Sequence, residues 1–270
     1  MMPAQQPAVD ADAFKACCAD LYGRDLVALI LGPAYHPGGR ELTRRLARMA
    51  NLRPGERVLD VASGPGDSAM LLAREFGANV HGVDLSPALV ALATAGASGA
   101  ALGSAVTFSV GDAERLAIDD GSVDAVLCEC ALCTFPDKRA AVEGFARVLA
   151  PHGRLLLADV VLDRDRLPEE LASLAGRVAC LADPLPLHGY LRLLETSGMR
   201  VCGLEHHGDA VVRMGQEIDA RLALLAAAGG GDGLDLSAAR RLSRSAIRAA
   251  EDGIVGYVVI TAELEGRTEA

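Results

Sequence analysis

The chain has 270 residues and a mass of 28.0 kDa, which suits one domain with an elaboration or a small cap. Its net charge of −10 argues against a nucleic-acid partner, because phosphate binding needs a basic surface. No apolar run approaches the roughly 20 residues that span a bilayer, so no membrane partner is expected either. Hydrophobic residues make up 51% of the chain but aromatic residues only 3%, so alanine, leucine and valine must build the core.

Residues 1–50 are expected to form an N-terminal helical cap. A disordered lead is followed by a helix pattern over 11–31, a breaker-rich loop over 32–39 and an amphipathic helix over 41–50. The loop around His36 could reach a functional site, but a surface turn shaped by its glycines and prolines is the favoured interpretation. The opening residues lack the apolar segment of a secretion signal. The seven cysteines are therefore expected to be reduced thiols in the cytoplasm.

Residues 51–205 alternate between strand and helix patterns, which predicts an α/β fold with helices on both faces of a mostly parallel sheet. The alternation is interrupted at 164–186, where a short helical insertion over the functional site is expected. The expected strands are 57–61, 79–83, 105–110, 123–128, 154–159 and 200–205, and the expected helices are 67–76, 86–100, 137–149 and 187–197.

The turn after the first of these strands carries the strongest local signal. The apolar run 58–61 ends in a small-residue turn, and a helix pattern opens at Asp67. Gly64 and Gly66 allow the backbone to approach a ligand without interference from a Cβ atom, and free N–H groups at the helix N-terminus face that ligand. A strand, a glycine turn and a helix start therefore predict a nucleotide-type site.

Further motifs follow along the chain in a fixed order. The second strand ends in Asp84, the position at which a βαβ unit holds a ribose diol. The third strand ends in Gly111-Asp112-Ala113, and residues 147–157 have the pattern of a helix end, a tight turn and a buried strand. A dinucleotide dehydrogenase would usually have a glycine where Ala69 stands, which is a weak argument against that class.

Taken together, these motifs cover roughly residues 45–205 and resemble the class I S-adenosylmethionine-dependent methyltransferases. The resemblance implies a Rossmann-like fold with a seven-stranded sheet, extra N-terminal helices, and a cofactor-binding domain at 51–205. It also implies S-adenosylmethionine as cofactor and S-adenosylhomocysteine as its product. The implied roles are the methionine amino group for Asp60, the methionine portion for Gly64 and Gly66, the ribose hydroxyls for Asp84, and adenine for Asp112 and Ala113, with Ala62, Leu85 and Glu129 as further cofactor candidates.

Residues 206–270 are expected to complete this fold. The run 256–263 is a clear strand pattern and fits the antiparallel seventh strand of the family. Helical patterns cover 210–228 and 237–251, the second with Ser237 as a plausible N-cap. Residues 206–253 would therefore be a helical insertion before the last strand.

Cysteines around the end of the fourth strand carry the substrate signal. In the methyltransferase fold the loop after this strand lies beside the departing methyl group. The spacing resembles the arsenite methyltransferases, in which one family cysteine matches Cys130, with Lys138 ending the stretch, and a second matches Cys180. The resemblance implies that Cys130 and Cys180 bind As(III) as substrate, with no resident metal and with a thiol reductant as a partner. Thiolates are soft ligands that suit this acceptor, and the transfer needs proximity more than acid–base help.

The remaining cysteines have less specific patterns. Strand alternation puts Cys128 on the same face as Cys130, which makes it a further catalytic candidate. Cys18, or its neighbour Cys17, is a candidate third ligand or redox partner, and Cys202 is expected to be a small buried apolar residue. A zinc site at Cys128, Cys130 and Cys133 is a weaker alternative, because the spacing lacks a second pair of standard form.

Departures from the arsenite family leave other functions open. Glu129 stands where the family usually has asparagine, and Cys128 and Cys133 are extra. One alternative is a small-molecule C-, N- or O-methyltransferase of the quinone-biosynthesis type, with Glu129, His36 or His188 as base. Another is a cysteine-rich metalloid-binding protein on a methyltransferase fold that no longer binds the cofactor.

Overall fold

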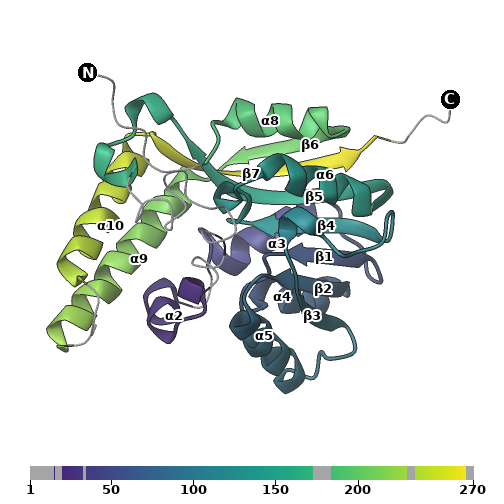
Figure 1. The fold of residues 1–270 in the computed structure, drawn as a ribbon, viewed down its shortest axis with the longest axis horizontal. Helices are drawn as coiled ribbons and strands as arrows, with labels where there is room; N and C mark the ends of the chain where they lie inside the picture. The colour runs from purple at the N-terminus through teal and green to yellow at the C-terminus, as the bar shows by residue number, and fades with distance from the viewer. Residues whose placement is uncertain (1–14, 16–19, 33–34, 173–183, 230–234, 266–270) are drawn as a thin grey trace.

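The computed structural model describes residues 15, 20–32, 35–172, 184–229 and 235–265. Within these ranges a single seven-stranded sheet has the order β3-β2-β1-β4-β5-β7-β6 (Figure 1). Neighbouring strands from β3 to β5 are parallel, and β7 runs antiparallel between β5 and β6. The strands are β1 (Arg57–Val61), β2 (Asn79–Asp84), β3 (Val106–Val110), β4 (Val123–Glu129), β5 (Leu149–Leu162), β6 (Met199–His206) and β7 (Val255–Leu264).

Helices cover both faces of this sheet. One buried cluster joins it to α3, α4, α5 and α10, and a second joins it to α6 and α8. The fold is therefore the expected Rossmann-like methyltransferase architecture. The α-helices are α2 (Asp25–Leu31), α3 (Gly39–Met49), α4 (Asp67–Phe76), α5 (Pro87–Gly99), α6 (Lys138–Val148), α8 (Leu187–Thr196), α9 (Gly208–Ala227) and α10 (Leu236–Glu251), and the short 3₁₀ turns are η1 (Ala113–Arg115), η2 (Leu132–Thr134), η3 (Arg164–Arg166) and η4 (Glu169–Ala172).

The central strand β4 shows why the strands of this sheet appear in the sequence as continuous apolar runs. Ala125 and Leu127 belong to one buried cluster, and Val126 and Cys128 belong to the other. Successive side chains of a strand point to opposite faces, so a strand covered on both sides must be apolar at every position. The sheet thus fixes the position of each strand end, where the polar residues begin.

Helix α3 carries a cluster of arginines, namely Arg40, Arg44, Arg45 and Arg48. Its inner face buries Leu42 and Leu46, and its outer face carries arginines that form ion pairs with neighbouring elements. Arg44 lies 2.6 Å from Glu75, and Arg45 pairs with Glu205. The arginines are therefore a solvated helix face, as the amphipathic pattern predicts.

Helices α9 and α10 pack against each other at one end of the sheet, with α2 beside α9 (Figure 1). They form the expected helical insertion between β6 and β7. Asp235, and not Ser237, is the N-cap of α10, because its side chain accepts a hydrogen bond of 2.9 Å from the Ala238 N–H. Among the described residues, no helix combines the length and the apolar character that crossing a bilayer requires.

Two more sequence expectations differ from the structure. Strand β5 begins at Leu149, several residues before the predicted start, because Leu149 already pairs with Val123. A register shift between Val123 and Ala125 then accommodates the turn around His152. Cys202 is exposed and not buried, because side chains alternate between the two faces of the edge strand β6 and Cys202 lies on its exposed face.

Candidate active site

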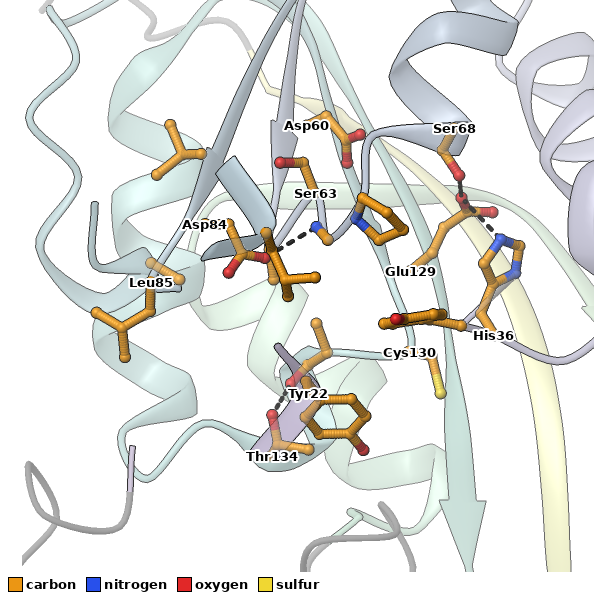
Figure 2. Close-up of a pocket in the computed structure, with 18 of the residues that line it drawn as sticks. Tyr22, His36, Asp60, Ser63, Ser68, Asp84, Leu85, Glu129, Cys130 and Thr134 are labelled. Carbon is orange, nitrogen blue, oxygen red and sulfur yellow. Dashed lines mark hydrogen bonds and ion pairs between the residues drawn. The ribbon is translucent and has the colours of Figure 1, made fainter. Parts of the chain in front are cut away.

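A pocket opens at the carboxyl ends of β1, β2, β3 and β4, where ligands bind in open α/β sheets. Side chains from the N-terminal part of the chain, including Lys15, Tyr22, Tyr35 and His36, close its other side. Figure 2 shows Asp84 on one side of this pocket, with Glu129 and His36 on the other. The predicted cofactor residues that line it are Asp60, Ala62, Gly64, Asp84, Leu85, Asp112, Ala113 and Glu129.

The two glycines of the turn after β1 have different tasks. Gly64 lines the pocket with a φ of +54°, and a Cβ atom there would come no nearer than 4.0 Å to Tyr35. Gly66 does not line the pocket, and its Cβ would lie 2.6 Å from Phe108. Gly66 is therefore required by its φ of +82° and by packing, and not by the approach of a ligand as the sequence suggested.

Ala62, which stands where the related family usually has glycine, also has a left-handed backbone, with a φ of 56°. This conformation explains the preference for glycine at that position, since only glycine adopts it without strain.

Asp60 lies at the end of β1 and is only 3% exposed. One carboxylate oxygen, Oδ2, has no hydrogen-bond partner among the described residues, while the carboxylate accepts a hydrogen bond from the Ala69 N–H. Burial raises the pKa of Asp60 well above its ordinary value, and the neighbouring Glu129 and Asp84 add to the effect. A buried carboxylate with an unsatisfied oxygen fits a positively charged ligand group.

Asp84 ends β2 and is held by two backbone donors. Its Oδ2 accepts from the Gly64 N–H at 2.8 Å, and its Oδ1 accepts from the Ser86 N–H at 2.8 Å. Burial raises the pKa of this carboxyl, and these two hydrogen bonds oppose the shift. Each oxygen keeps a further lone pair, so the carboxylate can accept from both hydroxyls of a diol.

Asp112, beyond the end of β3, is bound by a residue from the start of the chain. Lys15 Nζ lies 2.8 Å from Asp112 Oδ2 and 2.9 Å from Glu114 Oε2, and the Glu114 N–H donates to Asp112 Oδ1 at 3.0 Å. Although burial acts in the opposite direction, these hydrogen bonds lower the pKa of Asp112. The carboxylate is therefore ionised and fixed beside Ala113, at the edge of the pocket.

Glu129, the last residue of β4, lies in a network of short polar contacts (Figure 2). Its carboxylate accepts from Thr43 Oγ1 at 3.0 Å and from Ser68 Oγ at 2.5 Å, and His36 Nε2 lies 3.6 Å from it. His36 is only 9% exposed and lines the pocket, so the surface-turn interpretation of its loop is wrong. Neither Thr43 nor Ser68 was predicted as a site residue, because neither belongs to a recognisable motif.

Cys130 follows β4 directly and lines the pocket. Its N–H donates to the Ala158 carbonyl at 2.7 Å, and its φ of 52° lies in the left-handed region, which is rare for a residue other than glycine. Such strain is concentrated at functional sites. The turn also breaks the strand alternation, so Cys130 packs against one buried cluster and Cys128 lies inside the other.

The remaining predicted cysteines divide into two groups. Cys128 is 0% exposed, burial raises the pKa of its thiol well above the ordinary value, and it lies in the other buried cluster from Cys130, so it cannot act beside Cys130. It does not line the pocket, so it lies on the opposite side from the position that alternation predicted. Cys17, Cys18 and Cys180 lie outside the described residues.

Comparison with known proteins bears on this site. A family model described as a methyltransferase domain matches residues 59–157, from β1 into β5. An uncharacterized protein of Haemophilus influenzae is 30% identical over 183 residues, which cover 67% of this chain and 73% of that protein. The chain belongs to the S-adenosylmethionine-dependent methyltransferases. Its cofactor is accordingly S-adenosylmethionine, and the carboxylates predicted to bind it line one pocket.

Two further methyltransferases resemble the chain over part of their own length. The arsenite methyltransferase of Halobacterium salinarum is 32% identical over 167 residues, which cover 57% of this chain and 41% of that protein. The solved structure of Haemonchus contortus phosphoethanolamine N-methyltransferase 2 in complex with S-adenosyl-L-methionine has a TM-score of 0.78 at 21% identity. It covers 97% of this chain and 62% of that chain, and at this identity the likeness shows the fold alone.

The residues of the pocket fit S-adenosylmethionine. The unsatisfied Oδ2 of Asp60 suits the amino group of the methionine portion, and Asp84 has lone pairs for the ribose hydroxyls. Gly64 leaves space beside them, since nothing but Tyr35 approaches its Cβ position. Asp112 and Ala113 stand at the edge where adenine would lie, although Lys15 already occupies one carboxylate oxygen of Asp112.

Proposed function

We propose that this methyltransferase acts on a soft acceptor bound by the thiolate of Cys130, most specifically on trivalent arsenic as arsenite or methylarsenite. The observation that carries the proposal is the position of Cys130 in the same pocket as Asp60 and Asp84. Its left-handed backbone turns the residue away from the strand alternation, a strained arrangement that a merely structural cysteine does not need. The partial similarity to an arsenite methyltransferase supports the same substrate class.

In this proposal the main task of the protein is to position the cofactor and the acceptor next to each other. S-adenosylmethionine, when bound, supplies an activated methyl group. Asp60 would hold the amino group of its methionine portion, and Asp84 would hold its ribose hydroxyls. Cys130, in the same pocket, would hold the acceptor beside them. A thiolate is a soft ligand that prefers soft centres such as As(III), and holding two reactants in contact accounts for much of the rate of such a transfer.

The test uses purified protein with S-adenosylmethionine, arsenite and a thiol reductant, with methylated arsenicals separated by chromatography and detected by mass spectrometry. Wild-type protein is expected to form mono- or dimethylated arsenic, and Cys130→Ser is expected to form none. Cys202→Ser is the matched control, because that cysteine is exposed on β6. Binding of S-adenosylhomocysteine, measured by calorimetry, should be the same in all three proteins. A Cys130→Ser variant that still methylates arsenite would contradict the proposal.

One observation favours a second candidate function, the methylation of a small organic molecule. His36 Nε2 lies 3.6 Å from a carboxylate oxygen of Glu129, and both residues line the pocket. A histidine held by a carboxylate is a common general base, and it would remove a proton from an oxygen, nitrogen or carbon nucleophile. His188, the other histidine candidate, is exposed on α8 and does not line the pocket. Product with an organic acceptor that is lost in His36→Gln and kept in Cys130→Ser would favour this function.

A further inference from the structure

The loop after β4 brings together donor atoms that the sequence did not connect. Cys130 ends the strand, η2 turns the chain back at Cys133, and Asp159 lies on the neighbouring strand β5. The two Sγ atoms and a carboxylate oxygen of Asp159 all lie within 4.8 Å of one another. Of the three groups in this cluster, Cys130 lines the pocket, and Cys133 and Asp159 are buried beside it.

The cluster is held rigidly. The Cys133 N–H donates to Asp159 Oδ2 at 2.8 Å, and the Val160 N–H donates to Asp159 Oδ1 at 2.7 Å. Cys133 is 1% exposed and Asp159 is 0% exposed, so packing restricts both side chains. A site with fixed donors loses little conformational entropy when it binds a ligand.

A further buried polar group, the hydroxyl of Tyr257, lies near the cluster of Cys130, Cys133 and Asp159. The hydroxyl of Tyr257 on β7 is buried and has no hydrogen-bond partner among the described residues. Burial raises the pKa of Tyr257 well above its ordinary value, and Cys130, Glu129 and Asp159 lie near enough to add to the effect. A buried hydroxyl without a partner is costly, so a ligand with a polar atom would satisfy it.

We propose that Cys133 is the second thiolate that binds the arsenic acceptor together with Cys130, and that Asp159 positions Cys133 and accepts a hydrogen bond from the hydroxyl group on the bound arsenic. The inference rests on the proposed function and replaces the expectation that Cys180 supplies the second sulfur. Two sulfurs separated by two residues suit one soft centre, whereas a lone buried thiol would bind it weakly.

The binding step balances without an oxidant or a reductant. Arsenous acid, As(OH)₃, reacts with the two thiols to form two As–S bonds while two As–O bonds and two S–H bonds break. The thiol protons leave in two water molecules, and arsenic remains trivalent with one hydroxyl group. That hydroxyl can donate to the Asp159 carboxylate, because an ionised carboxylate accepts hydrogen bonds at both of its oxygens.

The experiment separates the second thiolate from the methylation chemistry. Phenylarsine oxide, which binds a pair of thiols, is titrated into the protein without S-adenosylmethionine, and native mass spectrometry counts the bound equivalents. Cys17 and Cys18 are replaced by serine in every sample, because adjacent thiols bind the same probe. One equivalent is expected for this background and for its Cys180→Ser and Cys202→Ser variants, and none for Cys130→Ser or Cys133→Ser.

Kinetics give a second readout on the same variants. Losing one of two thiolates turns a chelated ligand into a singly bound one, so KM for arsenite in Cys133→Ser should rise by roughly 100-fold. Affinity for S-adenosylhomocysteine should not change, which also shows that the variant is folded. Cys133→Ala is the alternative variant if a buried serine hydroxyl prevents folding.

Two results would overturn the inference. A Cys133→Ser variant that keeps its equivalent of arsenical while Cys180→Ser loses it would assign the second sulfur to Cys180 and leave the proposed function standing. Stoichiometric zinc in the purified wild-type protein, lost in Cys133→Ser, would assign the three donors to a resident metal. By contrast, a bound arsenical at Cys130 and Cys133 without any methylated product would contradict the proposed function and leave the two-thiolate site intact.

Discussion

The carboxylates at the ends of β1 and β2 and Cys130 after β4 line one pocket but are positioned in different ways. Asp84 is fixed by two backbone N–H groups of nearby turns, and Asp60 ends a strand buried on both faces. Cys130 and Cys133 instead stand in a strained loop, and their neighbour Asp159 comes from a separate strand. We refer to these as the cofactor half and the acceptor half of the pocket.

The difference teaches how one fold serves many substrates. The cofactor half depends on backbone atoms of consecutive elements, so a change of side chain elsewhere leaves it intact. The acceptor half depends on a loop conformation and on side chains from β4, β5 and β7, so a few substitutions can alter its chemistry. Four predictions test this division, in order of decreasing effect.

The largest effect is expected for Asp84→Ala. It removes an acceptor for both ribose hydroxyls and leaves the Gly64 and Ser86 N–H groups without their partner. Loss of two charge-assisted hydrogen bonds should weaken binding of S-adenosylhomocysteine by roughly 100-fold or more, measured by calorimetry. Asp124→Asn, which changes only an exposed ion pair with Arg57, is the control. A loss below about threefold for Asp84→Ala, on the scale of an exposed ion pair, would mean that the cofactor half is wrongly assigned.

The second prediction concerns Asp60→Asn and separates binding from stability. Charge-assisted contact with the amino group is lost, so affinity for S-adenosylhomocysteine should fall by roughly 10- to 100-fold. Stability of the ligand-free protein should change in the opposite direction. Because the pKa of Asp60 is raised on folding, its contribution is favourable below the unfolded value of 3.8 and is lost as the pH rises towards the folded pKa.

At neutral pH the raised pKa of Asp60 therefore lowers the stability of the ligand-free protein, and Asp60→Asn should raise its Tm. The same substitution should flatten the fall of Tm with rising pH. A lower Tm at neutral pH, measured by thermal unfolding without ligand, would contradict the assigned direction of the pKa shift.

The third prediction compares the two glycines of the turn after β1. Gly66→Ala places a Cβ 2.6 Å from Phe108 at a φ of +82°, so it should lower stability by about 2 kcal/mol or more. Gly64→Ala has a φ of +54° and open space, so it should cost only about 1 kcal/mol but weaken cofactor binding more. Denaturant unfolding and calorimetry measure the two effects. Equal losses of stability would show that packing does not distinguish the two positions.

The smallest effect is expected outside both halves, at the ion pair of Glu205 with Arg45. The hydrogen bond from Arg45 lowers the pKa of Glu205 to about 2. Its stabilising contribution is therefore present above the unfolded value of 4.5 and is lost as the pH falls towards 2. Because the pair is largely exposed, Glu205→Gln should lower Tm only slightly at pH 7, less at pH 3, and not once the pH has fallen to about 2. An unchanged cofactor affinity in this variant sets the baseline for the other three.

The sequence predicts the fold and the cofactor half well. Apolar runs mark strands buried on both faces, and a carboxylate that follows such a run must lie at the edge of the sheet, as Asp60 and Asp84 do. Gly66 is the exception in this half. Its neighbour Phe108 belongs to a strand far along the chain, so the packing reason for the glycine was not visible.

The acceptor half was predicted only in part. Alternation placed Cys128 and Cys130 on one face because it could not foresee the left-handed turn at Cys130. Asp159 received no role, although an acid inside the apolar run 155–162 is a signal that a buried partner or ligand is required. Its contact with Cys133 follows from the pairing of Glu129 with Ala158, and register between strands cannot be read from one sequence.

The late position of β7 in the chain has a consequence for folding. β7 lies between β5 and β6 and pairs with both, but α9 and α10 separate it from β6 in the sequence. While the chain is being synthesised, the apolar strand β5 therefore has an unpaired edge until the helical hairpin has emerged. Tyr257 also reaches the cysteines only with this last strand. We expect the acceptor half to become ordered after the cofactor half, and the length of the hairpin to set how long β5 needs protection from aggregation.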